Sequence, residues 1–496
     1  MMKPPFAYSD AYFYSCFYSY AYSHTRHFFT HLLLCNRRWY MALLGMKSTR
    51  VVDKIRKNAV SLICVNLFCW PQFSVAAETL EQAWGIALQR DHTLAAAQQK
   101  ENVAAHQVAA AQANYLPKLA LEAGYLRTES EPAAKVNIPA LPFLKGVALP
   151  FAQDSAYFGG VSVSAPLYTG GKISSGVGAA QAQAEAVQAR SQLSKSELKL
   201  ALAHAYISVL RAEHAVTVAN SHIAAVGKHV SDVLALFEQG YVARHDLLAS
   251  QVALANAEQL GLQAGNALAM ARAAYNRWLG RPQDGVVDIF DIGTRSQAAA
   301  GSELNRDVNN DLTYLLSSAN ARRKELQELD LQSLAYKKQA ASVAAGHLPQ
   351  IGVSAGWSKL ENRYLAQDKG WWVALVMKWE LFDGGLLRNQ AAQLSATAQA
   401  IQEVQEDTRE RIALQVRQSW LSQQESNARM ALVGKASEQA DETLLLARER
   451  YRSGLAPNSD VLDAETRRLQ AYSNRDNAIY DRELARLQLQ YASGQL

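Results

Sequence analysis

The sequence predicts an α+β membrane protein in which one layout of β-strands and long helices is used twice. The first observation is an internal repeat, because ANYLPKLALEAGY at 113–125 resembles AGHLPQIGVSAGW at 345–357. The second is a set of four short segments in which apolar and polar residues alternate. The third is a pair of proline-free helical stretches, at 172–238 and 386–452, which are far longer than ordinary globular helices. A repeat unit of this length is not a short solenoid period.

The spacing of the repeat divides the chain into two halves. The segments above have an offset of 232, whereas PLYTGGK at 166–172 matches ELFDGGL at 380–386 with an offset of 214. The same offset of 214 relates FEQGYVARHDLL at 237–248 to YRSGLAPNSDVL at 451–462. The register therefore slips once, from 232 to 214. The predicted parts are a first repeat at 78–280, an equatorial linker at 281–305 and a second repeat at 306–496.

We assign the slip to a long loop at 128–156, which contains four prolines. Its counterpart in the second repeat, at 359–370, is short. Loops that vary while the rest of a repeat is fixed are expected on an outward-facing surface.

The N-terminal segment 1–77 is expected to precede the folded part. Residues 46–77 resemble a secretory signal peptide, with a basic start, the short apolar run Ala59–Trp70 and the small-residue cleavage site Val75-Ala76-Ala77. A buried amphipathic helix is the alternative. Residues 1–45 hold 13 aromatic side chains and little pattern. We interpret them as a mis-assigned start or a disordered extension, with a short membrane-active segment as the alternative.

The basic charge of the sequence belongs to this leader. All four cysteines lie before residue 77, and the part that follows carries 41 basic and 43 acidic residues, a net charge of −2. Charge therefore gives no case for nucleic-acid binding.

Four short segments have the two-residue period of β-strands. In the first, Leu119, Leu121 and Tyr125 lie on one face, and Lys118 and Glu122 lie on the other. Such faces, with aromatic residues near the segment ends, are typical of transmembrane β-barrel strands. A half-buried sheet in a soluble domain is the alternative. Four strands cannot close a barrel, and lipid does not tolerate open strand edges, so we expect several copies of the chain to pool their strands. The other segments are 161–167, 351–357 and 371–381.

The helical stretches are expected to form long rods that turn back at glycines. One helix is predicted from Gly170-Gly171 to residue 238 and another from Gly384-Gly385 to residue 452, each about 100 Å long. The rods turn at Gly240-Tyr241 and at Gly454-Leu455, where glycine adopts positive φ without strain. Return helices are predicted at 245–279 and 459–492, and shorter helical segments at 79–115 and 306–346, each of the shorter ones ending at a Leu-Pro pair that begins a strand.

In the order and spacing of these motifs, the chain resembles the TolC family of outer-membrane efflux proteins over residues 79–495. The motifs are the Leu-Pro strand entry, the Gly-Gly strand exit and the paired tip segments. The resemblance implies a homotrimer whose 12-stranded β-barrel, with four strands per chain, lies in the outer membrane. It also implies that a long α-helical tunnel continues the barrel through the periplasm.

The resemblance further implies roles for residues near the helical tips. Asp460 and Asp463 stand where the family often places the aspartates that constrict the pore. In a trimer, the carboxylates of three copies would lie close together, which raises the pKa of some of them and favours cations in the opening. The alternative is that both aspartates are solvated residues at the start of a helix. Asp246 and Tyr451 match a pair that locks the closed state, but Ala456 replaces the arginine of that lock. The candidates to replace the arginine are Arg244, Arg448 and Arg452.

At the tips the resemblance implies two protein partners. One is a periplasmic adaptor (membrane fusion) protein, and the other is an inner-membrane transporter of the RND, ABC or MFS type. The residues that match the docking turns are Gly240, Tyr241, Gly454 and Leu455.

The sequence indicates no catalytic site, no cofactor and no metal. It has no Gly-rich phosphate loop and no HExxH motif. His222 and His229 lie seven positions apart on one helix face. Because they lack acidic or cysteine partners at ligand spacing, we interpret them as solvated helix residues rather than as a metal site.

We therefore predict an outer-membrane channel of a tripartite export system, a passive conduit for drugs or other substrates. It would contact outer-membrane lipid and extend into the periplasm. The outer-membrane component of type I protein secretion is one alternative. A soluble or surface coiled-coil scaffold is an alternative of another class, which explains the rods but not the four strands. The sequence names no cargo.

Overall fold

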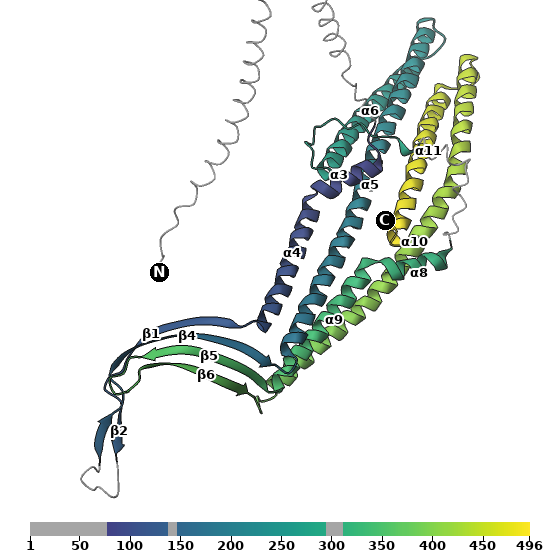
Figure 1. The fold of residues 1–496 in the computed structure, drawn as a ribbon. Coiled ribbons are helices and arrows are strands. Elements are labelled where there is room, and N and C mark those ends of the chain that lie inside the picture. The colour runs from purple at the N-terminus through teal and green to yellow at the C-terminus, as the bar shows by residue number, and fades with distance from the viewer. Residues whose placement is uncertain (1–76, 137–145, 294–310) are drawn as a thin grey trace, which may run out of the picture. The chain divides into compact units, whose positions relative to one another are not determined.

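A computed structural model describes residues 77–136, 146–293 and 311–496 of the chain (Figure 1). The expected extension at 1–45 lies outside the described residues, as does the expected signal peptide except for its last residue, Ala77. The other segments outside them are 137–145, within the predicted long loop, and 294–310, around the expected start of the second repeat.

The long helices keep the spacing of the sequence repeat. Helices α5 (Lys172–Glu238) and α10 (Leu386–Arg452) each have 67 residues, and their first residues are 214 positions apart. The return helices α6 (Arg244–Trp278) and α11 (Asn458–Ala492) each have 35 residues and are again 214 positions apart. The predicted rods and return helices are therefore confirmed.

The two shorter helical segments are each divided, so the prediction of a single helix there was wrong. Helices α3 (Leu80–Arg90) and α4 (His92–Gln112) are separated by Asp91, whose backbone is extended. The Asp91 carboxylate accepts a hydrogen bond from the Leu94 amide at 2.9 Å, and a cap of this kind starts a new helix without proline or glycine. The second copy divides at the equivalent position, Arg323, between α8 (Leu312–Arg322) and α9 (Lys324–Ala344).

Four strands form one antiparallel sheet next to the ends of the helices (Figure 1). The Leu-Pro pairs do precede strands, because the 3-10 turns Ala113–Tyr115 and Ala345–His347 end just before them. The order in the sheet is β1-β4-β5-β6, so β1 and β6 each have one edge that no other described strand pairs with. The strands are β1 (Lys118–Arg127), β4 (Ser155–Tyr168), β5 (Gln350–Leu360) and β6 (Lys369–Lys378).

The predicted loop at 128–156 contains a second, smaller sheet that the sequence analysis did not predict. Strands β2 (Ala133–Val136) and β3 (Val147–Pro150) pair antiparallel within it. Strand β4 also begins at Ser155, earlier than the predicted segment. Each short strand has only four residues, which is too few for alternation to stand out from a proline-rich sequence.

One face of the four-stranded sheet is apolar and exposed. Leu121 on β1 is 80% exposed and Trp371 on β6 is 84% exposed, although large apolar side chains are usually buried when they lie together on one face. The opposite face is polar, since cross-strand pairs join Lys118 to Ser164 and Ser164 to Ser354. Among the helices of the described residues, none combines the length and the apolar character needed to cross a membrane.

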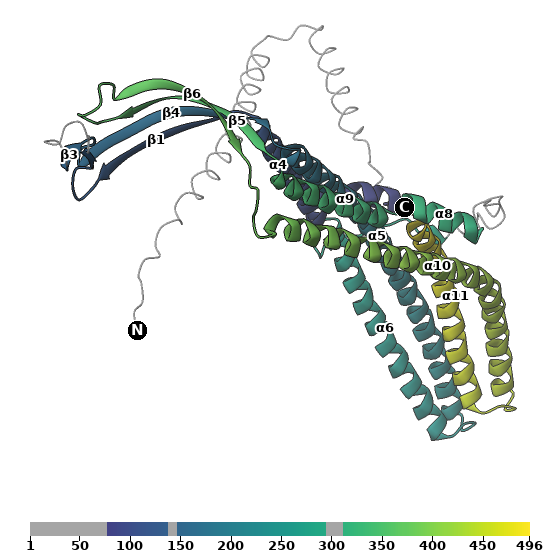
Figure 2. The ribbon, with the colours of Figure 1, turned by 90° about the horizontal axis from the view of Figure 1, so that it is seen from below.

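The helices are held together by a core around the middle of α5. The hydroxyl of the fully buried Tyr206 lies within hydrogen-bond distance of two carbonyl oxygens, that of Glu78 at 2.9 Å and that of Phe290 at 2.6 Å. These bonds attach the start of the first repeat and the described part of the linker to α5. Helix α5 also packs against α6, α9 and α11, so the hairpins α5–α6 and α10–α11 run side by side (Figure 2).

Candidate functional site

Both helical hairpins turn through the same backbone motif at their tips. Gly240 has φ +78°, and the Gly240 and Tyr241 amides each donate a hydrogen bond of 2.9 Å to a carbonyl in the last turn of α5. Gly454, with φ +69°, and Leu455 form the equivalent bonds at 2.9 and 2.8 Å in the last turn of α10. This is the Schellman arrangement, which favours glycine because other residues are strained at positive φ. The predicted turns are confirmed.

Each turn exposes one apolar side chain. Tyr241 is 75% exposed and Leu455 is 72% exposed. Exposed apolar groups at the end of a rigid hairpin are suited to contact with another protein. Docking at these turns remains a prediction.

Asp460 and Asp463 lie near the start of α11, beside the second tip. Both are outside the buried core, and Asp460 is in the first turn of the helix, where a negative charge is favourable. Three positions on a helix separate them, so their side chains share one side of α11. Their role in a pore constriction remains a prediction.

The predicted lock pair does not form a hydrogen bond in the described part of the chain. Tyr451 is buried, and its hydroxyl oxygen has no hydrogen-bond partner among the described residues. Burial, and secondarily the charge of Asp246, raise the pKa of the Tyr451 hydroxyl. The Asp246 carboxylate instead lies 3.3 Å from Nε2 of His245. The lock role of Asp246 and Tyr451 therefore remains a prediction.

One of the three candidate arginines joins the two hairpins. Nη2 of Arg452 on α10 lies 2.9 Å from the carboxylate of Asp232 on α5. Arg448 instead pairs with the buried Glu465 within the second hairpin.

A buried polar cluster at the tips was missed by the sequence analysis, and the interpretation of His229 as solvated was wrong. His229 on α5 is only 4% exposed, and its Nε2 lies 2.7 Å from Oδ1 of Asn458, the first residue of α11. The side-chain nitrogen Nδ2 of Asn458 donates to the Asp246 carbonyl at 3.0 Å and to Ser250 Oγ at 2.9 Å. Since the Asn458 nitrogen is used in this way, Oδ1 accepts and Nε2 of His229 donates. We call His229, Ser250 and Asn458 the inter-hairpin cluster.

The inter-hairpin cluster lies next to apolar side chains from all four tip helices. Tyr451 stacks edge-on against His229, with 5.5 Å between ring centroids. Burial lowers the pKa of His229, outweighing the opposing effect of its bond to Asn458. The histidine is therefore held in its neutral form. The buried apolar side chains are Val233, Leu247, Leu444, Tyr451, Val461 and Ala464.

The described residues offer no arrangement for catalysis or metal binding. No group of three or more His, Cys, Asp or Glu side chains in that part of the chain is placed to hold a metal. Residues 352–356, GVSAG, do fit the GxSxG pattern of a serine nucleophile. They lie within β5, paired on both sides, rather than at the sharp strand-to-helix turn that such a nucleophile needs.

Comparison with known proteins identifies similar folds and one family. Residues 84–281 and 315–495 match a family model described as outer membrane efflux protein. No curated protein sequence matches the chain.

Several solved structures resemble the chain at low sequence identity. The outer membrane protein VceC of Vibrio cholerae aligns with a TM-score of 0.69 and 18% identity, covering 84% of this chain and 96% of VceC. The CmeC outer membrane channel of Campylobacter jejuni gives 0.68 and 14%, covering 84% and 85%. The open state of the MtrE outer membrane channel of Neisseria gonorrhoeae gives 0.64 and 18%, covering 84% and 88%.

Proposed function

The chain belongs to the outer membrane efflux protein family, and from this premise we propose that it is the outer-membrane component of a tripartite export system. It is a channel and not an enzyme, it resides in the outer membrane, and it extends into the periplasm. We further propose that the channel is a passive homotrimer that carries drugs or other exported compounds. In this assembly it would bind a periplasmic adaptor and an inner-membrane transporter, and the transporter would supply the energy.

The observation that carries the proposal is the sheet with two unpaired edges and one exposed apolar face. Unpaired backbone groups at β1 and β6 are not tolerated in lipid, so the edges must pair with further strands. Single-chain barrels begin at about eight strands, and three copies of this sheet supply twelve. A soluble coiled-coil scaffold would gain nothing from Leu121 or Trp371 on an exposed face.

The tips support docking of a partner at the opposite end of the hairpins from the sheet. Their two turns are closed by backbone hydrogen bonds, share one backbone conformation, and expose Tyr241 and Leu455. Asp460 and Asp463 lie beside the second turn only, so we propose that this turn borders the constriction. Arg452, through Asp232, is our candidate to replace the missing lock arginine.

Crosslinking in living cells tests the proposed assembly. All natural cysteines lie before residue 77, so Tyr241→Cys or Leu455→Cys introduces a single thiol into the part that follows. We expect either thiol to capture a periplasmic adaptor with a photoactivated maleimide reagent. The matched control is Met270→Cys on α6, which is 71% exposed and far from the turn. Capture equal to that of the control, at normal outer-membrane abundance, would count against tip docking.

A further inference from the structure

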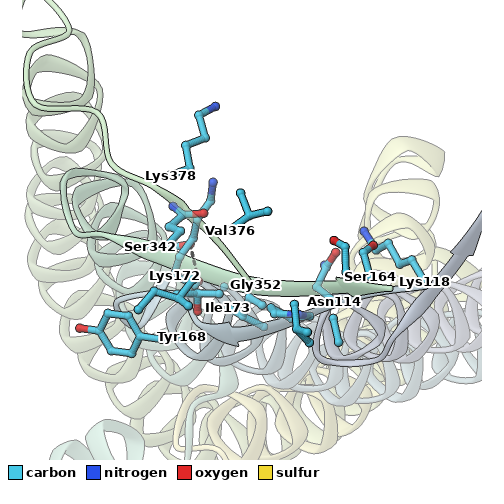
Figure 3. Close-up of a pocket in the computed structure, with 18 of the residues that line it drawn as sticks. Asn114, Lys118, Ser164, Tyr168, Lys172, Ile173, Ser342, Gly352, Val376 and Lys378 are labelled. Carbon is cyan, nitrogen blue, oxygen red and sulfur yellow. Dashed lines mark hydrogen bonds between the residues drawn. The ribbon is translucent and has the colours of Figure 1, made fainter. Parts of the chain in front are cut away.

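A cavity of about 580 Å³ opens on the polar face of the sheet, where the strands meet the first turn of α5 (Figure 3). Three lysines line it, one each from β1, α5 and β6, and no acidic side chain among the described residues does so. Hydroxyl and amide groups complete its polar lining, including those of Asn114, Ser164, Ser342 and Gln350.

The three lysines, Lys118, Lys172 and Lys378, are exposed and have no ion-pair partner in the described parts of the chain. On β1, the acidic residue of the same face is Glu122, four positions farther along, about 13 Å. Like charges without counter-charges raise the positive potential in a concave wall, and the lysine ammonium group is a strong donor to phosphate and carboxylate oxygens. The cavity is therefore suited to anions.

We propose that this cavity is an anion-binding site for molecules that carry two or more phosphate, sulfonate or carboxylate groups. The site rests on the proposed channel, because the polar face of the sheet lines a passage only in a closed barrel. It adds a ligand class that membership of the family does not specify.

The preference for polyvalent anions follows from the spacing of the lysines. Lys118 and Lys378 lie on the two edge strands, three strand spacings or about 14 Å apart across the sheet. Lys378 also lies four positions beyond Ala374, the β6 residue level with Lys118, which adds about 13 Å along the strands. A single small anion cannot contact both. Lys172 begins α5 and lines the same cavity, so an extended polyanion can contact it together with one edge lysine.

Closure of the barrel would bring the edge lysines of neighbouring copies together. Lys118 is the first residue of β1 and Lys378 is the last residue of β6, so both lie at the helical end of the sheet. If β6 of one copy pairs antiparallel with β1 of the next, this end of the barrel is encircled by lysines. Substrates leaving the helical part would meet that ring before they enter the barrel.

Block of the full-length channel by tripolyphosphate in planar bilayers tests the site. Replacing the lysines together, as Lys118→Gln, Lys172→Gln and Lys378→Gln, should raise the half-blocking concentration about tenfold or more, since each lysine contributes an exposed ion pair to the bound anion. The matched control is Lys135→Gln, Lys359→Gln and Lys369→Gln, which removes equal charge at the far end of the strands. The control should be blocked like the wild type. Inorganic phosphate should block the wild type and the control more weakly than tripolyphosphate does.

Two further measurements keep the outcomes distinct. The triple Lys→Arg variant at 118, 172 and 378 should retain block, because it retains charge. Equilibrium dialysis of radiolabelled tripolyphosphate against the detergent-solubilised protein measures binding without conduction. Normal conductance with equal block and equal binding in the Gln variant overturns the anion site alone. Absence of conductance from the wild type, with binding intact, overturns the channel and leaves the site.

Discussion

His229, Ser250 and Asn458 form an inter-hairpin cluster whose stability we expect to depend on the protonation of His229. The cluster is buried and its hydrogen bonds cross from the first hairpin to the second. A buried polar network of this kind stabilises only while every member is satisfied. Charged groups surround the histidine on three helices, with Asp232 on α5, Arg448 on α10 and Glu465 on α11.

The pH dependence of this contact can be predicted from the direction of the pKa shift. The pKa of His229 is lowered below its ordinary value of 6.5 in the folded protein, so the neutral form stabilises the fold. That stability is complete above pH 6.5 and is lost as the pH falls through the folded value. We expect the thermal unfolding midpoint of the solubilised protein to fall on acidification, and His229→Gln, which keeps a donor but does not titrate, to fall less.

The control for this experiment is His245→Gln, whose side chain is 82% exposed at the same tip. It should follow the wild type. If the unfolding midpoints of His229→Gln and of the wild type fall equally on acidification, the stability of the inter-hairpin cluster does not depend on pH.

The two tip aspartates give a second prediction at the scale of residues. Asp460→Asn with Asp463→Asn should lower the cation-to-anion permeability ratio in planar bilayers roughly twofold or more, because carboxylates in a narrow opening attract cations. Glu403→Gln with Glu410→Gln removes two exposed acids in the first half of α10, far from the tip, and should leave the ratio unchanged. Unchanged selectivity in the aspartate variant would remove Asp460 and Asp463 from the constriction.

At the scale of elements, most helix ends that depend on neighbouring residues could be predicted from the sequence. Features that depend on contacts between distant residues could not. Gly171 and Gly385 mark the starts of α5 and α10, and Gly240 and Gly454 mark their ends, because each glycine acts on its own backbone. The break after α3 was missed although its signal is local, since Asp91 caps the Leu94 amide three positions away. The break after α8 was missed because Arg323 makes contacts outside its own segment. Arg323 reaches the carbonyls of α11, far away in the sequence.

The candidate site shows the same division. The turns at the tips follow from local sequence and were predicted. The burial of His229 depends on Asn458, 229 positions away, and no periodicity of α5 reports that contact. Tyr451 is buried against the His229 ring, and its hydroxyl has no hydrogen-bond partner among the described residues, a second arrangement that the sequence does not indicate.

At the scale of the whole molecule, the sheet supports the proposed association of several copies of the chain. Its two free edges and its apolar face cannot be satisfied within one chain. The helices point to the same association, because α10 exposes large apolar side chains such as Leu432 and Leu445 along its length.

Crosslinking between edge strands measures the number of copies. Leu119→Cys on β1 and Met377→Cys on β6 lie at the same end of the sheet, on exposed apolar residues. A reagent shorter than about 14 Å cannot join them within one chain, so in membranes it should yield a ladder that ends at three chains. Either cysteine alone should give no ladder. A ladder that continues beyond three would contradict the twelve-stranded barrel.

The matching tip turns determine how many equivalent binding positions a docking partner would find on the assembled channel. Three chains would present six turns of one backbone conformation, carrying Tyr241 and Leu455 in alternation. A partner that binds the exposed backbone of the turns would find six equivalent positions. A partner that distinguishes a phenol from an isobutyl group would find only three, so the stoichiometry of the assembly depends on which chemical group the partner recognises.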